Sequence, residues 1–205
     1  MFADRTAAGR ELAATLESRD IEADVVLAIP RGALPVARPV ADTLEATLDV
    51  VVARKLGAPD NPELALGSVA SDGTVWLNDR LLERLGVGEE YLTSVQEREA
   101  ENAREKARKY REDPVDLAGR RVLVVDDGVA TGATAIACLR QVRAAGAEWV
   151  GLAVPVGSPD SLEVLEHEAD AVIALEKPAG FRAVGQFYQS FGQVSDEEAL
   201  TYLED

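Results

Sequence analysis

The amino-acid sequence predicts an α/β fold with a doubly wound, mainly parallel sheet. Short apolar runs of β-forming residues alternate with segments of helical spacing, which is typical of consecutive βαβ units. Four main parallel strands joined in this way require right-handed crossovers, and their ligands bind at the carboxyl ends of the strands. The length of 205 residues suits one domain, 1–205, with a core to about residue 175 and a smaller piece over about 176–205.

The first predicted elements are a helix and a strand. Residues 4–18 have helical spacing through Ala8, Leu12 and Leu16, so we expect a helix that packs on the sheet. Residues 25–29 form a short apolar run, which indicates a strand.

A turn and a second strand follow. Pro30, Arg31 and Gly32 break the first run before a helix expected over 34–46. The second strand is expected at 50–53, with Arg54 and Lys55 directly at its end.

The middle of the chain predicts a β-hairpin and a long helix. Residues 57–62 are rich in Gly, Pro and Asn, and 63–78 contain two short strands around a Ser-Asp-Gly turn at 71–73. A helical turn is expected at 79–85. Residues 89–112 indicate a long polar helix with a thin apolar stripe, mostly solvated.

The most informative segment is 122–134, Val-Leu-Val-Val-Asp-Asp-Gly-Val-Ala-Thr-Gly-Ala-Thr. Four β-formers predict a strand buried on both faces. Two carboxylates follow, and then a turn that leads into a helix expected over 133–145. The free N–H groups at the start of such a helix favour an anion such as phosphate. The carboxylates suit vicinal hydroxyls or a hydrated divalent cation, so this stretch can bind both ends of a sugar phosphate.

The remaining elements complete the sheet. Strands are expected at 150–156 and 171–175, with a helix from Ser158-Pro159 through Leu165 between them. Residues 176–193 are rich in aromatic residues and Gly. Ser195, with Glu198 three residues on, indicates a capping box for a C-terminal helix.

Composition narrows the classes of function. Asp and Glu number 37 against 21 Lys and Arg, a formal net charge of -16, which disfavours nucleic acid as a partner and resembles the bias of salt-loving organisms. No apolar run approaches a membrane span and no secretion signal is recognisable, so we expect a cytoplasmic protein. Cys138 and His167 are each the only residue of their type. We expect Cys138 in the core and His167 on a solvated helix face, which makes a His-based zinc site or a Ser-His triad hard to build.

Residues 122–134 resemble the signature that binds phosphoribosyl pyrophosphate in the type I phosphoribosyltransferase family. The resemblance implies that Asp126 and Asp127 engage the ribose hydroxyls, directly or near a magnesium ion held directly or through water. It also implies that a loop wraps the 5-phosphate. That loop comprises Ala130, Thr131, Gly132, Ala133 and Thr134.

The family pattern also assigns a pyrophosphate site. Arg31 and Gly32 match its pyrophosphate loop, which usually has an uncommon cis peptide, and Arg54 and Lys55 match its basic pair. Residues 57–76 match the place of a flexible β-hairpin loop that closes over the reacting centre. The implied catalytic residues are therefore Arg54, Lys55, Asp126 and Asp127, with Mg²⁺ as cofactor.

The implied reaction displaces pyrophosphate from ribose C1 by a ring nitrogen, through a transition state with oxocarbenium character. The partners are phosphoribosyl pyrophosphate and an unidentified acceptor base, and the family implies a homodimer. Ala130 stands where several 6-oxopurine members carry an acid, which weakens a hypoxanthine or guanine assignment and agrees with adenine-type members. Gly128 replaces a branched aliphatic residue of many relatives, so the base pocket is expected to be wider or differently built.

Relatives cover the base with a small C-terminal hood, which together with the C-terminal helix matches about residues 176–205 of this chain. The matching residues for a base pocket here are Gly128, Val129, Lys177, Phe187 and Tyr188, with Phe181 and Phe191 nearby in the chain. An aromatic ring can stack on a heterocycle, but plain packing of a small lobe is the alternative for each of them.

Two other functions stay open at this point. One is a non-catalytic domain of the same fold that senses phosphoribosyl pyrophosphate or a nucleotide and regulates another process. The other is a receiver-type domain with a magnesium-binding acid pair, which would leave the Thr-Gly turn at 131–132 unexplained.

Overall fold

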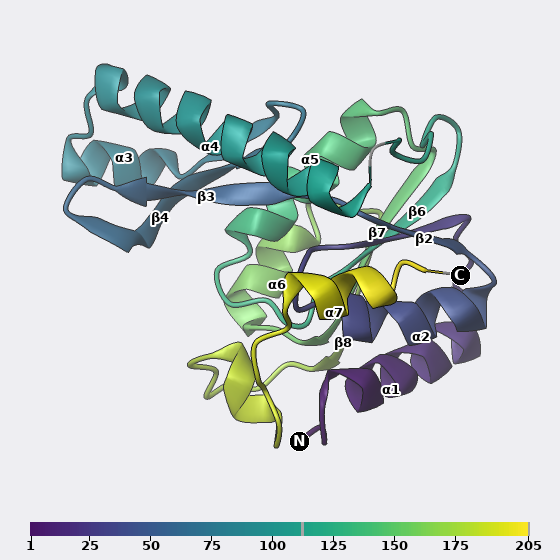
Figure 1. The fold of residues 1–205 in the computed structure, drawn as a ribbon. Helices are drawn as coiled ribbons and strands as arrows, with labels where there is room; N and C mark the ends of the chain where they lie inside the picture. Colours follow the sequence, from purple (N-terminus) through teal and green to yellow (C-terminus); the bar gives the residue numbers. More distant parts are fainter. Residues whose placement is uncertain (112, 205) are drawn as a thin grey trace.

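The computed structural model describes residues 1–111 and 113–204 and, for residue 63, the backbone. Over this range the main sheet has five parallel strands in the order β2-β1-β6-β7-β8 (Figure 1), one for each of the five segments expected as its strands, although only four were counted as its main strands. The strands are β1 Val25–Ala28, β2 Thr47–Val50, β6 Arg121–Val125, β7 Trp149–Val156 and β8 Ala171–Glu176. The predicted α/β fold with a doubly wound, mainly parallel sheet is confirmed.

Helices cover this sheet on both faces. Helices α1 (Arg5–Ser18) and α2 (Leu34–Leu44) pack on each other and on the sheet, and α5 (Ala133–Ala144) lies on the opposite side (Figure 1). Asp4 caps α1, because its carboxylate accepts a hydrogen bond from the Ala7 N–H at 2.7 Å. Cys138 on α5 is fully buried, as expected for a core residue.

The second strand differs from its prediction. The apolar run 50–53 was expected to be a strand of the main sheet, but β2 ends at Val50 and a strand of another sheet begins at Ala53. Asp49 lies inside β2 and is buried. Its carboxylate accepts hydrogen bonds from the N–H groups of Val50 and Val115 and pairs with Arg111 at 3.2 Å. A polar residue with three partners is tolerated in a buried strand, which an apolar pattern alone does not reveal.

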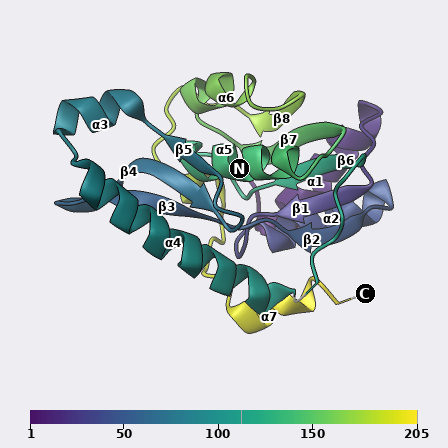
Figure 2. The ribbon, with the colours of Figure 1, turned by 90° about the horizontal axis from the view of Figure 1, so that it is seen from above.

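A smaller sheet projects from the first. In the described part of the chain it has three antiparallel strands, β3 Ala53–Ala58, β4 Asn61–Ala70 and β5 Val75–Leu77. The hairpin predicted around 71–73 is β4–β5, and β3 adds a strand that was not predicted. Helices α3 (Asp79–Leu85) and α4 (Glu89–Tyr110) follow, and α4 packs along β3 and β4 over a separate apolar cluster (Figure 2). The end predicted for the long helix, Glu112, lies outside the described residues.

The chain closes with short elements. Helix α6 (Pro159–Leu165) connects β7 to β8, and His167 lies exposed in the turn just after it, not on the helix. The hood contains a 3₁₀ helix, η1 (Val184–Phe187), and α7 (Asp196–Thr201) follows it. Ser195 caps α7 as predicted, accepting from the Glu198 N–H at 3.0 Å. In the described part of the chain, no helix has the length and apolar character that crossing a bilayer requires.

Candidate active site

The main sheet reverses its strand order between β1 and β6, and two candidate loops meet there. The crossover after β1 runs to β2 and the crossover after β6 runs to β7, in opposite directions. β1 and β6 pair in parallel from Val25–Val122 to Ala28–Val125, so both end at the same edge. A crevice forms where the order of a doubly wound sheet reverses, which makes this edge the expected ligand site.

The acid pair follows β6 directly. Asp126 and Asp127 are only partly accessible, and the Asp127 N–H donates to Asp126 Oδ1 at 2.8 Å. Burial, together with the charge of Asp127 beside it, raises the pKa of Asp126 well above its ordinary value. Burial also raises the pKa of Asp127, although its bond with Arg5 acts in the opposite direction. Two adjacent carboxylates held in this way favour a partner that supplies positive charge or hydrogen-bond donors.

Arg5 is a site residue that the sequence did not reveal. Its Nε lies 2.7 Å from Asp127 Oδ2, its Nη1 donates to the Gly192 carbonyl, and its guanidinium lies 3.8 Å from the centre of the Phe191 ring. Arg5 stands at the start of α1, far from Asp127 in the chain. Only the packing of α1 against the sheet brings the two together, so no local sequence signal was available.

The turn after β1 lies against the acid pair. A methyl group built on Gly32 would collide with the Asp127 carboxylate, so only glycine lets this turn approach so closely. The peptide bond between Pro30 and Arg31 is cis, as the family pattern led us to expect. The structure thus brings the predicted pyrophosphate loop and the predicted ribose-binding pair into contact.

The predicted phosphate loop leads into the N-terminus of α5. Gly132 has φ of 76°, a left-handed conformation that favours glycine, and it precedes the helix without a side-chain cap. Two hydroxyls fix the loop by donating to its carbonyls: Ser161 to Ala130 at 2.6 Å and Ser68 to Ala133 at 2.5 Å. With its carbonyls held from outside, the loop offers the start of α5 to an anion.

The basic pair reaches this edge from the smaller sheet. Arg54 and Lys55 were expected at the end of the second strand, but both lie within β3, opposite Val69 and Ser68 of β4. Both line a cleft of about 480 Å³ that also contains Pro30 and Thr134. The basic pair, the turn after β1 and the phosphate loop therefore border one cleft, although the predicted strand was wrong.

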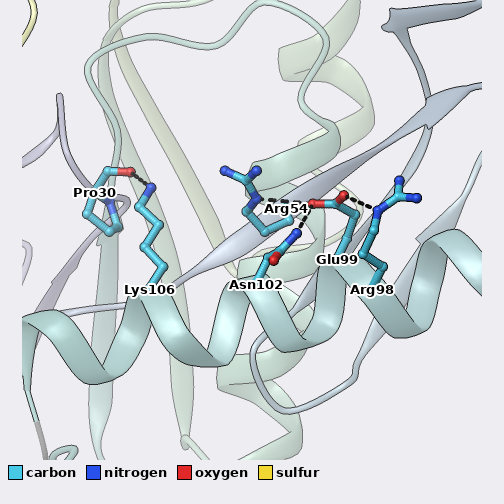
Figure 3. A network of polar contacts seen from close by, with 6 residues as sticks. All are labelled: Pro30, Arg54, Arg98, Glu99, Asn102 and Lys106. Atoms are coloured by element: carbon cyan, nitrogen blue, oxygen red, sulfur yellow. Dashed lines mark hydrogen bonds and ion pairs between the residues drawn. The ribbon is translucent and has the colours of Figure 1, made fainter.

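Helix α4 forms the other wall of the cleft (Figure 3). Arg54 Nε lies 3.3 Å from Glu99 Oε2, and Asn102 and Arg98 also donate to the Glu99 carboxylate. Burial would raise the pKa of Glu99, but these donors outweigh it and lower the pKa. Lys106 Nζ donates to the Pro30 carbonyl at 2.7 Å. The sequence indicated a mostly solvated helix and therefore missed this polar face.

Arg31 forms an ion pair with helix α7. Its Nη1 lies 3.3 Å from Asp196 Oδ1 on α7, and the Tyr110 hydroxyl donates to the same oxygen at 2.9 Å. The Tyr110 hydroxyl and Arg31 lower the pKa of Asp196, which is exposed.

Several hood residues contact other protein side chains. Phe181 and Phe187 stack with ring centres 5.5 Å apart, and Lys177 lies 3.6 Å from Glu166. Tyr188 is buried against Phe2, and its hydroxyl donates to the Asp127 carbonyl at 2.6 Å. Tyr188 thus links the hood to the acid pair.

The space beside Gly128 is filled from another segment. A methyl group built on Gly128 would lie 2.5 Å from Val184 Cγ1 and 3.0 Å from Val156 Cγ1. Val129 is buried as well. Val184 of the hood therefore fills the space beside Gly128, and the expectation of a base pocket at this position stays a prediction.

A divalent cation finds suitable but incomplete ligands here. The carboxylates of Asp126 and Asp127 are ligands that Mg²⁺ prefers, and Asp127 already pairs with Arg5. Among the described residues no group of three or more His, Cys, Asp or Glu side chains could hold a metal. The residues fit an ion that takes most of its oxygen ligands from a bound substrate and water.

Comparisons with known proteins agree with this geometry. The family model described as "Phosphoribosyl transferase domain" matches residues 3–186. Rv0571c of Mycobacterium tuberculosis, named provisionally as a phosphoribosyl transferase, is 43% identical over 206 residues, covering 100% of this chain and 46% of that protein. The chain thus spans about half the length of this curated relative.

Two further relatives extend the comparison. A uracil phosphoribosyltransferase of Streptomyces griseus is 36% identical over 107 residues, which cover 52% of this chain and 46% of that enzyme. The crystal structure of the protein TT1426 from Thermus thermophilus superposes with a TM-score of 0.84 at 43% identity, covering 99% of this chain and 97% of that one.

Proposed function

Because this chain belongs to the phosphoribosyl transferase family, we propose that it moves the 5-phosphoribosyl group of phosphoribosyl pyrophosphate to a nitrogenous base and releases pyrophosphate. The observation that carries the proposal is the contact between two loops at the sheet edge, where Gly32 abuts the Asp127 carboxylate. One loop suits a diol and a phosphate, and the other lies beside basic side chains. A donor with a phosphate at one end of a ribose and a pyrophosphate at the other matches this order.

The ribose 5-phosphate occupies the β6 side of the site in this proposal. Asp126 and Asp127 accept hydrogen bonds from the ribose 2- and 3-hydroxyls. The loop from Ala130 to Thr134 surrounds the 5-phosphate with N–H groups at the start of α5, and the hydroxyls of Thr131 and Thr134 add donors. Arg5 keeps the Asp127 carboxylate in place by the 2.7 Å contact.

The leaving group occupies the β1 side. Arg31, Gly32, Arg54 and Lys55 bind the pyrophosphate and neutralise the charge that grows on it as the C1–O bond breaks. Asp126 and Asp127 would hold a magnesium ion, directly or through water, and that ion would supply further positive charge near the leaving group. Most of the acceleration comes from holding donor and acceptor in line while water is excluded. We propose Arg54, Lys55, Asp126 and Asp127 as the catalytic residues.

The acceptor is a nitrogenous base of undetermined identity. Ala130 at the start of the phosphate loop supplies no acid for a purine N7 proton, which favours an adenine-type acceptor over a 6-oxopurine. Lys177, Phe187 and Tyr188 with Gly128 and Val129 remain the proposed surroundings of the base. The packing of Tyr188 and Val129 favours a role in shaping this pocket over direct contact. The homodimer and the cytoplasmic location also stay predictions.

The test measures pyrophosphate release from phosphoribosyl pyrophosphate with Mg²⁺, in high salt, for a panel of bases. We expect release with at least one base, and we expect Asp126→Asn and Asp127→Asn each to abolish donor binding in calorimetry. Donor binding without release for any base would favour the sensing domain. Donor affinity unchanged in both variants would refute the ribose assignment.

A further inference from the structure

A second cavity adjoins the proposed pyrophosphate loop. It has a volume of about 380 Å³ and lies between the turn after β1, strand β3, helix α4 and the start of α7. Its lining residues are Arg31, Arg54, Asn102, Glu105, Lys106, Lys109 and Asp196. Arg54 lines both this cavity and the 480 Å³ cleft, so the two spaces adjoin at one of the proposed pyrophosphate ligands.

The charge of this cavity is opposite to that of the chain. Its lining residues include four cationic side chains and two carboxylates, whereas the whole chain has 37 acidic and 21 basic side chains. Two of the chain's four lysines are Lys106 and Lys109, one turn apart on α4. Such a local reversal of sign attracts an anion and raises its local concentration.

Lys106 is held at the mouth of the pyrophosphate loop. Its ammonium group donates to the Pro30 carbonyl at 2.7 Å (Figure 3). Arg31 is the next residue in the chain. Burial lowers the pKa of Lys106, and the charges of Arg54 and Arg31 lower it further. An anion in the cavity would relieve this repulsion among the three cations.

Two of the cations are paired with carboxylates that an anion could replace. Arg31 contacts Asp196 and Arg54 contacts Glu99, each at 3.3 Å. The Arg31 and Arg54 side chains are 39% and 45% exposed. The Arg31–Asp196 pair is exposed on both sides and contributes little stability. Glu99 is only 13% exposed, but it also accepts hydrogen bonds from Arg98 and Asn102, so it keeps donors when Arg54 turns to another anion. A bound polyphosphate can therefore take over both arginines at small cost.

We propose that Lys106 and Lys109 of helix α4 bind the pyrophosphate group of the donor, together with Arg31 and Arg54. This inference rests on the proposed function and adds to it two ligands from outside the motif positions. Lys106 contacts both the loop and the anion. Lys109 lines the cavity wall and attracts the anion by its positive charge.

The experiment measures binding by calorimetry, with inorganic pyrophosphate plus MgCl₂ as one probe and ribose 5-phosphate as the other. We expect Lys106→Met and Lys109→Met each to weaken pyrophosphate binding about tenfold or more, as loss of a charge-assisted contact does. The affinity for ribose 5-phosphate should stay within about twofold, because that ligand occupies the β6 side. Lys106→Arg should restore most of the lost pyrophosphate affinity.

Arg108→Met is the matched control, since it removes one positive charge from an exposed position of the same helix and should leave both affinities unchanged. Wild-type pyrophosphate affinity in Lys109→Met would overturn the inference, as would an equal loss of both ligands in Lys106→Met. A wild-type protein that binds ribose 5-phosphate but no pyrophosphate would overturn it while leaving the ribose site intact. A wild-type protein that binds neither probe would overturn the proposed function itself.

Discussion

The neighbouring residues Asp126 and Asp127 differ in their interaction partners. Asp127 has Arg5 as an ion-pair partner, with only about 16% of its side chain exposed, whereas Asp126 accepts the Asp127 N–H and lies beside a like charge. The sequence placed both acids after a buried strand and so predicted their role as a pair. It could not distinguish them, because the difference comes from Arg5, which is 122 positions away.

The two acids should therefore respond differently to neutralisation. Asp126→Asn should raise the melting temperature at pH 7, because it removes a buried charge and its repulsion of Asp127. Asp127→Asn should raise the melting temperature less, because the change removes a charge that burial disfavours but also leaves Arg5 without its charged partner. Thermal unfolding of wild type and both variants, without ligand, measures these changes.

The gain from Asp126→Asn should depend on pH. The pKa of Asp126 is higher in the folded protein than in the unfolded chain, so its stabilising protonation is complete below the unfolded pKa, about 3.9. That contribution is lost as pH rises through the folded pKa. The melting temperature of the variant relative to wild type should thus increase from about pH 4 upward. A constant or shrinking difference would contradict the raised pKa.

At the scale of elements, the sequence predicted the main sheet better than the region that surrounds the site. Buried parallel strands such as β6 and β7 are continuous apolar runs, which a pattern identifies directly. Strand β3 contains Arg54, Lys55 and Gly57 and pairs with β4 through irregular register, so its pattern is weak. The sequence predicted that the polar face of α4 is solvated. Its partners lie in β3 and in the turn after β1, which are distant in the chain, so the local pattern did not reveal them.

One close contact between the hood and the main sheet can be tested. Gly128→Ala should destabilise the protein by about 1–3 kcal/mol, because its new methyl group would press on Val184 of η1 and on Val156 of β7. Val184→Ala removes the nearer of the two neighbours and should make the Gly128→Ala change much less costly. The measurement is a double-mutant cycle by urea denaturation.

The cycle has a clear contrary outcome. If the two costs simply add, Val184 does not occupy the space beside Gly128, and the hood sits differently from the structure. Gly73→Ala serves as a control for loss of a glycine, since it has no atom within 4 Å of an added methyl group, although its φ of 95° adds backbone strain. Its cost should not change when combined with Val184→Ala.

At the scale of the whole molecule, composition supplies a property that the fold does not. The chain has a net charge of -16, whereas the cavity beside the candidate site is lined by clustered cations. Self-repulsion of the acids opposes the compact state, whereas the clustered cations of the cavity create a local positive potential that attracts anions despite the negative net charge. The motif predicted where the phosphate loop lies. The position of the α4 lysines needed the structure, since it depends on how α4 packs along strands β3 and β4 of the smaller sheet.

Salt should therefore have opposite effects on stability and on ligand binding. Raising KCl from about 0.1 M to about 1 M shortens the screening length from about 10 Å to about 3 Å, which relieves repulsion among the acids. We expect the melting temperature to rise by at least about 4 °C, or about 1–2 kcal/mol for a chain of this length. Over the same range the affinity for pyrophosphate should fall, because the attraction of the cationic cavity is screened too. Repeating the melt near the pH of zero net charge is the control, because the repulsion is small there and KCl should change the melting temperature little. A melting temperature that is flat or falls with KCl at pH 7 would show that self-repulsion does not limit the stability of this acidic chain.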